Sequence, residues 1–199
     1  PGTEPRPGND LQLYMDANLQ KAAEDALMKA MKDHPSARAG VAVVLDVKTG
    51  GVLAMASVPG FDPNKLVTGI TQAELNRLLD EREWRFSNLA TTGLYPPGST
   101  FKIVSAIAAL AEGKTTPTET FYDPGYHPNV PSLPCNKAGG HGAVNIVEAL
   151  QYSCNTYFYE MGRRLGMDAM AKYATVLGLG RKTGVDLFGE NYGTVPSTE

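Results

Sequence analysis

The chain is poor in the residue types that mark several common protein classes. Its 199 residues include only 2 cysteines, too few for a scaffold built on disulfides. The formal net charge is −3, so the basic excess typical of nucleic-acid-binding proteins is missing, and we expect no nucleic-acid partner. No apolar run approaches the length of a membrane span. What is present is an ordinary globular composition, 42% hydrophobic and 20% charged, long enough to bury a core.

Periodic patterns predict several helices and one pair of strands. Asp16 suits the N-cap of a helix that runs to about Lys32, because apolar residues recur along one side of that segment. The apolar runs 41–46 and 52–57 predict two strands joined as a β-hairpin. The remaining predictions are a short strand over 11–15 and helices over 71–79, 146–150, 157–165 and 167–177. These elements indicate an α+β fold, in which two strands alone would be unstable and further strands are required.

Ser99 and Lys102 are the most informative pair of residues. They lie between a Pro-Pro-Gly turn and an apolar run that predicts a helix with Ile103, Ile107 and Leu110 buried. Their spacing places both side chains on one helix face, near an N-terminus that favours negative charge. Burial and the positive helix end would both lower the pKa of Lys102. The pattern therefore predicts a serine nucleophile with a lysine base, and its alternative is an N-cap serine beside a solvated lysine.

Ser153 and Asn155 form a second candidate group, in a short turn between two predicted helices. A hydroxyl in such a turn could relay a proton between a lysine and a leaving amine. A carboxamide could hold a peptide backbone through one donor and one acceptor. The alternative is that Asn155 merely caps the helix that follows.

Together, these motifs resemble the transpeptidase domain of penicillin-binding proteins, a superfamily that carries S-x-x-K with a Ser-x-Asn partner. The resemblance spans nearly the whole chain, and residues 61–64 and 121–125 look most like the class B, cell-elongation type. It implies the penicillin-binding transpeptidase and serine β-lactamase-like fold, an α+β arrangement with a helical half beside an antiparallel sheet.

The resemblance also implies a function, that of a peptidoglycan D,D-transpeptidase that forms a serine acyl-enzyme and is acylated by β-lactams. Ser99 would attack the D-Ala-D-Ala carbonyl of a stem peptide, and Lys102 would take its proton. Ser153 would pass a proton to the departing D-alanine, and Asn155 would orient the substrate amide. No cofactor is expected for catalysis. The full-length protein is expected on the periplasmic side, anchored to the inner membrane and associated with a glycosyltransferase in an elongation complex.

One family motif, a Lys-Thr-Gly triplet on a sheet strand, has no convincing counterpart. The triplets at 48–50 and 182–184 are predicted to lie in a hairpin turn and a glycine-rich loop. Residues 1–10 are rich in proline and glycine and are expected to be a linker from an upstream domain. Residues 11–199 are expected to be the N-terminal part of a transpeptidase domain whose downstream strands are missing. Two other functions stay open, a β-lactam sensor module and a non-catalytic fragment.

Both cysteines lie near other metal-binding residue types. The carboxylate, imidazole and two thiols that would complete a tetrahedral zinc site belong to Asp123, Cys135, His141 and Cys154. A structural zinc would pin the long segment 114–142, which we expect to be mostly irregular, to the turn that holds Ser153. The alternatives are a disulfide between the two cysteines, or free thiols. His34 and His127 have no comparable partners and are expected to be solvated.

Overall fold

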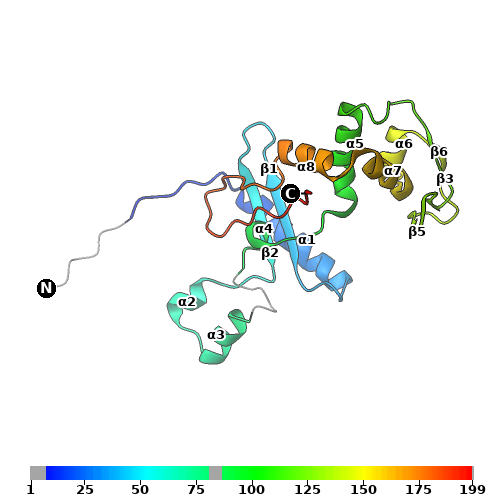
Figure 1. Cartoon of the computed structure of the whole chain (residues 1–199). Coiled ribbons are helices and arrows are strands. Elements are labelled where there is room, and N and C mark those ends of the chain that lie inside the picture. Colours follow the sequence, from blue (N-terminus) through cyan, green and yellow to red (C-terminus); the bar gives the residue numbers. More distant parts are fainter. Residues whose placement is uncertain (1–7, 81–86, 199) are drawn as a thin grey trace. The chain divides into compact units, whose positions relative to one another are not determined.

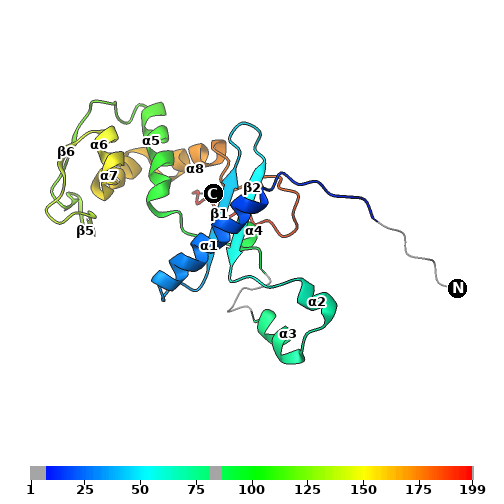
Figure 2. The same cartoon turned by 180° about the vertical axis from the view of Figure 1, so that it is seen from behind.

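The computed structural model describes residues 8–80 and 87–198. The chain divides into two compact units, Pro1–Gly93 and Leu94–Glu199 (Figures 1 and 2). Helices and antiparallel strands both occur, as expected for the α+β class. Within the described ranges, no helix combines the length and the apolar character that crossing a membrane requires.

The first unit is a β-hairpin with a long helix packed against it (Figure 1). Strand β1 (Gly40–Leu45) pairs antiparallel with β2 (Val52–Val58). Helix α1 (Ala17–Asp33) begins at Asp16, whose carboxylate accepts two backbone N–H groups of the first turn. The helix and the hairpin were both predicted correctly, because each has a strong periodic signal and clear end signals.

Three short helices follow the hairpin. They are α2 (Asn64–Thr68), α3 (Gln72–Leu78) and α4 (Leu89–Thr92). The prediction of α3 is confirmed, and its N-cap Thr71 forms a reciprocal capping box with Glu74. Helix α2 was not predicted, because five residues are too few to show a helical period.

The expected strand over residues 11–15 is wrong. These residues have no regular secondary structure. The exposed fractions of Leu11 and Leu13 are 84% and 63%. Only the next residue, Asp16, donates its N–H to β2, to the carbonyl of Leu53 at 2.9 Å. An apolar run does not become a strand unless a neighbouring strand pairs with it.

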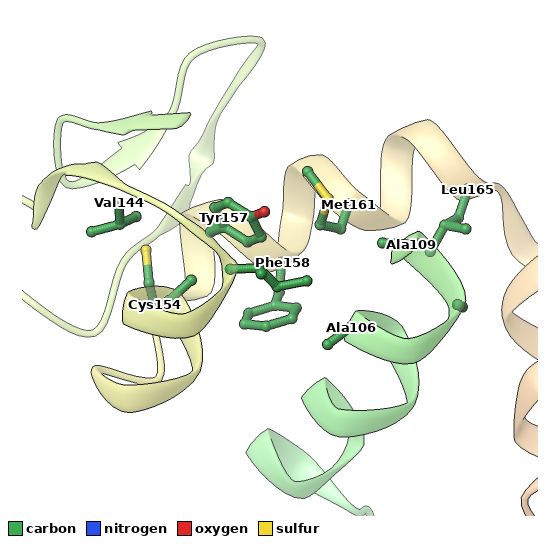
Figure 3. Packing of buried hydrophobic residues seen from close by; sticks show 11 residues of the cluster. Ala106, Ala109, Val144, Cys154, Tyr157, Phe158, Met161 and Leu165 are labelled. Atoms are coloured by element: carbon green, nitrogen blue, oxygen red, sulfur yellow. The ribbon is translucent and has the colours of Figure 1, made fainter. Parts of the chain in front are cut away.

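The second unit has a helical core (Figure 3). Helix α5 (Lys102–Ala111) follows a 3₁₀ turn and packs against α7 (Asn155–Leu165) and α8 (Met167–Val176). The shorter α6 (Ile146–Gln151) precedes α7. The cluster of buried side chains comes mainly from α5, α6 and α7, with Val144 and Cys154 added, and includes Ala106, Ala109, Ala149, Tyr157, Phe158 and Met161.

The buried face of α5 differs from the prediction. Ile103, Ile107 and Leu110 are 60%, 40% and 41% exposed. The buried side chains are smaller and include Ala106 and Ala109, which face α7 in Figure 3. Small residues allow two helices to approach closely, so the contact with α7 and not the size of the apolar residues decides which face is buried.

The segment 114–142 is mostly turns and coil, as expected, and it also contains short paired strands. Strand β3 (Phe121–Asp123) pairs with β6 (Gly142–Val144), and β4 (Tyr126–His127) pairs with β5 (Val130–Pro134), both antiparallel. The prediction of a mostly irregular segment is confirmed, because turns and coil make up most of it, but its short strands were not predicted. Strands of two to five residues, interrupted by glycine and proline, are too short to show an alternating pattern.

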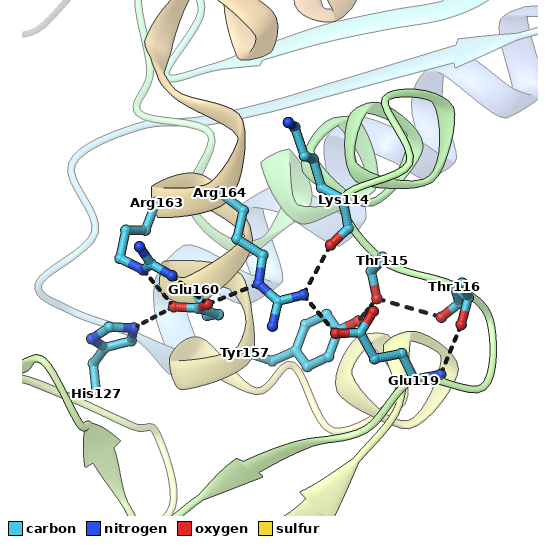
Figure 4. A network of polar contacts seen from close by, with 9 residues as sticks. All are labelled: Lys114, Thr115, Thr116, Glu119, His127, Tyr157, Glu160, Arg163 and Arg164. Carbon is cyan, nitrogen blue, oxygen red and sulfur yellow. Dashed lines mark hydrogen bonds and ion pairs between the residues drawn. The ribbon is translucent and has the colours of Figure 1, made fainter.

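A buried ion-pair network ties this segment to α7 (Figure 4). Glu160 is 4% exposed, and its carboxylate accepts hydrogen bonds from Arg163 and Arg164 and lies 3.2 Å from His127 Nε2. Hydrogen bonds from Arg163 lower the pKa of Glu160 to about 2, against the opposing effect of burial. Arg164 also donates to Glu119. His127 is 1% exposed, so the prediction that it is solvated is wrong.

Candidate active site

Ser99 is presented at the surface, one turn before α5. It lies in the 3₁₀ turn Gly98–Phe101, which leads directly into the α-helix at Lys102. The side chain of Ser99 is exposed, whereas Lys102 is half-buried. The predicted arrangement, a serine one turn before a lysine at a helix start, is therefore present in the structure.

Ser153 occupies the turn between α6 and α7 in an unusual backbone conformation. Its φ is 52°, in the left-handed region. The N–H of Ser153 bonds the carbonyl of Leu150 at 3.1 Å, and the N–H of Cys154 bonds that of Ala149 at 2.8 Å. This pair of bonds is a Schellman motif, in which glycine normally takes the left-handed position. A serine held there indicates strain of the kind that collects at functional sites.

A chain of hydrogen bonds joins the two predicted groups. The amine of Lys102 lies 2.6 Å from the carbonyl oxygen of Ser153, 3.0 Å from its Oγ and 2.6 Å from Asn155 Oδ1. The Ser153 hydroxyl lies 3.0 Å from the Oγ of Ser99. The structure thus brings together all four residues, and these contacts connect Lys102 to Ser99 through Ser153.

The surroundings of Lys102 favour its neutral form. Burial lowers the pKa of the amine, while the nearby sulfurs of Cys154 and Cys135 oppose this shift. A neutral amine has two N–H donors, which match the two carbonyl oxygens at 2.6 Å. The lone pair on the Lys102 nitrogen can then accept a hydrogen bond from the Ser153 hydroxyl. This arrangement can accept a proton that travels from Ser99 through Ser153.

The side chains of the four candidate metal ligands also lie close together, next to this turn. One donor atom from each of Asp123, Cys135, His141 and Cys154 lies within 4.8 Å of the others. Asp123 Oδ2 lies 2.8 Å from His141 Nδ1 and 3.2 Å from Cys154 Sγ. The two sulfurs are 3.8 Å apart and are not bonded to each other. Cys154 is the residue between Ser153 and Asn155, so this cluster and the active-site turn share one stretch of backbone.

The cluster is buried and polar, as a metal centre would be. Burial raises the pKa of the Cys154 thiol to about 12. Burial also acts to raise the pKa of Asp123, but hydrogen bonds from Cys135, the Gly125 N–H and His141 outweigh it and hold this pKa below the ordinary range. Cys154 itself is fully buried. Two thiols, one imidazole and one carboxylate are ligand types that zinc accepts in a four-coordinate site.

Neither Lys-Thr-Gly triplet lies on a strand. The triplet at 48–50 forms the turn between β1 and β2, and the one at 182–184 lies in a loop without regular structure. Both placements agree with the prediction.

Sequence reasoning missed two residues next to these groups. The Phe158 ring lies 5.7 Å from the Lys102 amine and contributes a cation–π contact when the amine is charged. Thr156 is fully buried beside Asp123 and Cys135. Both follow Asn155 on α7, and no pattern in the sequence separates them from ordinary core residues.

Comparison with known proteins identifies the family of the chain. The family model described as the penicillin binding protein transpeptidase domain matches residues 40–199. The chain belongs to this transpeptidase family. Two curated relatives of this transpeptidase chain are the peptidoglycan D,D-transpeptidase MrdA of Acinetobacter baumannii and the stage V sporulation protein D of Bacillus subtilis. They are 38% and 40% identical to it over 98% and 96% of its length. The chain spans 28% of each relative.

Solved structures show the same fold. Pseudomonas aeruginosa PBP2 in complex with WCK 5153 is 40% identical, with a TM-score of 0.84 over 96% of this transpeptidase chain and 42% of that one. The complex between PBP2 and MreC from Helicobacter pylori gives 31% identity and a TM-score of 0.78, over 92% and 33% of the two chains. The penicillin-binding transpeptidase fold inferred from the motifs is thereby confirmed.

Proposed function

We propose that the protein is a peptidoglycan D,D-transpeptidase that reacts through an acyl-enzyme on Ser99. The observation that carries this proposal is the unbroken contact chain from Lys102 through Ser153 to Ser99, flanked by Asn155. Family membership and the names of the curated relatives support it. The substrate class is a stem peptide that ends in D-Ala-D-Ala, and β-lactams are its mimics.

In the acylation step, Ser99 Oγ forms a bond to the carbonyl carbon of the D-Ala-D-Ala amide. The Ser99 proton moves to Ser153, and the Ser153 proton moves to the neutral amine of Lys102. Asn155 holds the substrate amide while it accepts a hydrogen bond from Lys102. The backbone N–H of Ser99 stabilises the oxyanion, and such a donor contributes about 3–4 kcal/mol.

Collapse of this intermediate breaks the amide C–N bond, and the proton returns through Ser153 to the departing amine of D-alanine. The amine of a second stem peptide then attacks the acyl carbon, and the ester bond to Ser99 Oγ breaks. The proton lost by the amine passes through Lys102 and Ser153 back to Ser99, and the new amide is the cross-link. A β-lactam would stop at the acyl-enzyme because its leaving group stays tethered. The chemistry needs no cofactor at any of these steps.

Labelling with a fluorescent penicillin tests this proposal in the full-length protein. We expect Ser99→Ala to abolish labelling. Ser105→Ala is the matched control, because Ser105 is a buried serine on α5 outside the hydrogen-bond chain, and it should keep labelling. Labelling of Ser99→Ala at the wild-type rate would refute the assigned nucleophile.

Mass spectrometry separates the alternatives. A long-lived adduct together with cross-linking of stem peptides supports the transpeptidase. A long-lived adduct without cross-linking indicates a β-lactam sensor module, and no adduct at all indicates a non-catalytic fragment.

We also propose that Asp123, Cys135, His141 and Cys154 hold a structural zinc ion. The chain's own donors fit this ion in type, number and convergence. The ion would fix the segment 114–142 to the active-site turn through Cys154. Metal analysis of protein purified without chelator tests this proposal. Absence of zinc, with both thiols free or joined in a disulfide, would end it.

The cellular setting follows from the same family. We propose that the full-length protein acts on the periplasmic side, held by a membrane anchor, within an elongation complex that includes a glycosyltransferase. The Helicobacter pylori PBP2 complex with MreC supports an assembly of this kind. Co-purification of the full-length protein from cross-linked cells tests it, and recovery without other cell-wall proteins would contradict it.

A further inference from the structure

Thr156 has a buried hydroxyl that makes no hydrogen bond of good geometry, although it lies close enough to Asp123 and Cys135 to act on the pKa of both. Among the described residues, two buried side-chain polar atoms lack a partner, and these are Thr156 Oγ1 and His127 Nδ1. Thr156 is 0% exposed, so water does not reach its hydroxyl from the surface. Burying a hydroxyl without a partner costs about 1–3 kcal/mol, which calls for an explanation.

The usual partners of a threonine near a helix start are already engaged. A threonine in a helix commonly bonds the carbonyl three or four residues earlier. Here the carbonyl of Ser153 takes the Lys102 amine at 2.6 Å, and the carbonyl of Tyr152 takes Asn136 Nδ2 at 3.2 Å. The Thr156 hydroxyl bonds neither of them.

The neighbours of Thr156 are metal-ligand candidates. Its backbone N–H is directed at the Cys135 sulfur, and the N–H of Tyr157 is directed at the Cys154 sulfur. Both N–H groups belong to the first turn of α7, where an N–H group has no partner within the helix. The Thr156 hydroxyl itself lies beside the Cys135 sulfur and the Asp123 carboxylate.

A metal ion bound to the cluster would change what the Cys135 sulfur needs. As a thiol, Cys135 donates to Asn136 Oδ1 at 3.2 Å. As a metal-bound thiolate it can only accept, so it needs donors. The Asp123 oxygens already accept the N–H groups of Gly125 and His141. The hydroxyl of Thr156 is the neighbouring donor that has not yet formed a hydrogen bond of good geometry.

We infer that the Thr156 hydroxyl donates a hydrogen bond to the Cys135 thiolate when the cluster holds zinc. Thr156 is thus a positioning residue for the metal, and it is adjacent in sequence to Asn155. This inference rests on the proposed zinc site. Partners of this kind set the orientation and basicity of a ligand, and their loss weakens metal binding by about 10- to 100-fold.

The test measures metal binding by the full-length protein. Thr156→Val removes the hydroxyl at nearly constant volume, and Thr156→Ser keeps it. The matched control is Thr91→Val, a buried threonine in the other unit whose hydroxyl donates to the carbonyl of Asn88. Zinc affinity is measured by competition with a chromophoric chelator. Cobalt(II) is then loaded in place of zinc, and its thiolate-to-metal charge-transfer band is recorded.

We expect Thr156→Val to bind zinc about 10- to 100-fold more weakly, with the cobalt band moved to longer wavelength. Thr156→Ser and Thr91→Val should match the wild type in both measurements. Wild-type affinity and band position in Thr156→Val would overturn this inference alone, as would a Thr156→Ser variant as weak as Thr156→Val. Failure of the wild type to bind either metal would overturn the zinc site together with this inference.

Discussion

At the scale of single residues, the charge of Lys102 depends on the three oxygens around its amine. When the amine is charged, all three accept from it, namely the carbonyl and hydroxyl of Ser153 and the amide of Asn155. When the amine is neutral, the Ser153 hydroxyl becomes the donor. The same contacts therefore suit both protonation states, as a residue that gains and loses a proton in each cycle requires.

A pH profile of acylation follows from this environment. Burial lowers the pKa of Lys102, so the neutral base is present at lower pH than for a lysine in water. We expect the rate of penicillin acylation to rise with pH and to level off below the pH at which an ordinary lysine titrates. Lys102→Met should slow acylation by about 10²–10⁴-fold and remove this pH dependence. Stopped-flow kinetics measure both effects, and a Lys102→Met variant with the wild-type profile would contradict the assigned base.

Gly140 is a second residue that the backbone conformation requires, because no other residue type fits at its position. Its φ is 76°, and a Cβ at this position would collide with the backbone of Asp123 and Gly125. The close approach places Asp123 next to His141. We expect Gly140→Ala to lower the free energy of unfolding by about 2–4 kcal/mol and to weaken zinc binding. Gly139→Ala is the matched control, because it has a similar φ but open space around its Cβ. Denaturant unfolding of both variants measures the difference, and equal losses would contradict the argument from close approach.

At the scale of elements, α7 links the active-site turn to the buried charges. Asn155 is its first residue, and Glu160 lies in its middle among His127, Arg163 and Arg164 (Figure 4). The chain around residues 114–127 is attached to α7 at both places, through the cysteine cluster and through Glu160. Displacement of α7 would therefore move Asn155 and loosen this segment together.

The acid dependence of stability tests the role of Glu160. Its pKa is about 2 in the folded protein, below the 4.5 of an unperturbed glutamate. Its contribution, up to about 3 kcal/mol, is therefore complete above the unfolded-state pKa and is lost as the pH falls through about 2. We expect Glu160→Gln to be destabilised at pH 7, with the difference from wild type shrinking between about pH 5 and pH 2. Urea unfolding at several pH values measures this, and a difference that does not change with pH would contradict it.

The elements differ in how far the sequence determines them. Helix α1 and the β1–β2 hairpin could be predicted because their signals are local, in the cap at Asp16 and in two apolar runs with a turn between them. The buried face of α5 could not, because it depends on which helix packs against it. The pairs β3–β6 and β4–β5 are short, and their strands are held by partners up to 23 residues away in the chain.

The same distinction holds within the candidate site. Ser99, Lys102, Ser153 and Asn155 could be named because the family motif carries them. Thr156 and Glu160 could not, because their roles depend on burial and on partners brought close only by folding.

At the scale of the whole molecule, the proposed zinc couples stability to active-site geometry. A ligand that binds only the folded state stabilises it by about 4 kcal/mol when its concentration is 1,000 times its dissociation constant. We expect a strong chelator to lower the melting temperature and to slow penicillin acylation. Added zinc should reverse both effects, and magnesium should not. Differential scanning calorimetry and labelling kinetics measure these changes.

A variant that lacks one thiol provides the control for this experiment. Cys135→Ser should start with a lower melting temperature and respond little to the chelator, because it has lost one of the four donors. An equal response of both proteins to the chelator would show that the metal, if any, binds elsewhere.

The left-handed backbone at Ser153 limits which hydroxyl amino acid can serve there. Threonine offers the same functional group, but its branched Cβ is poorly tolerated at a φ of 52°. Serine and threonine carry the same functional group but are therefore not equivalent at this position. Ser153→Thr would be unfavourable because of the left-handed backbone conformation and not because of the reactivity of its hydroxyl group.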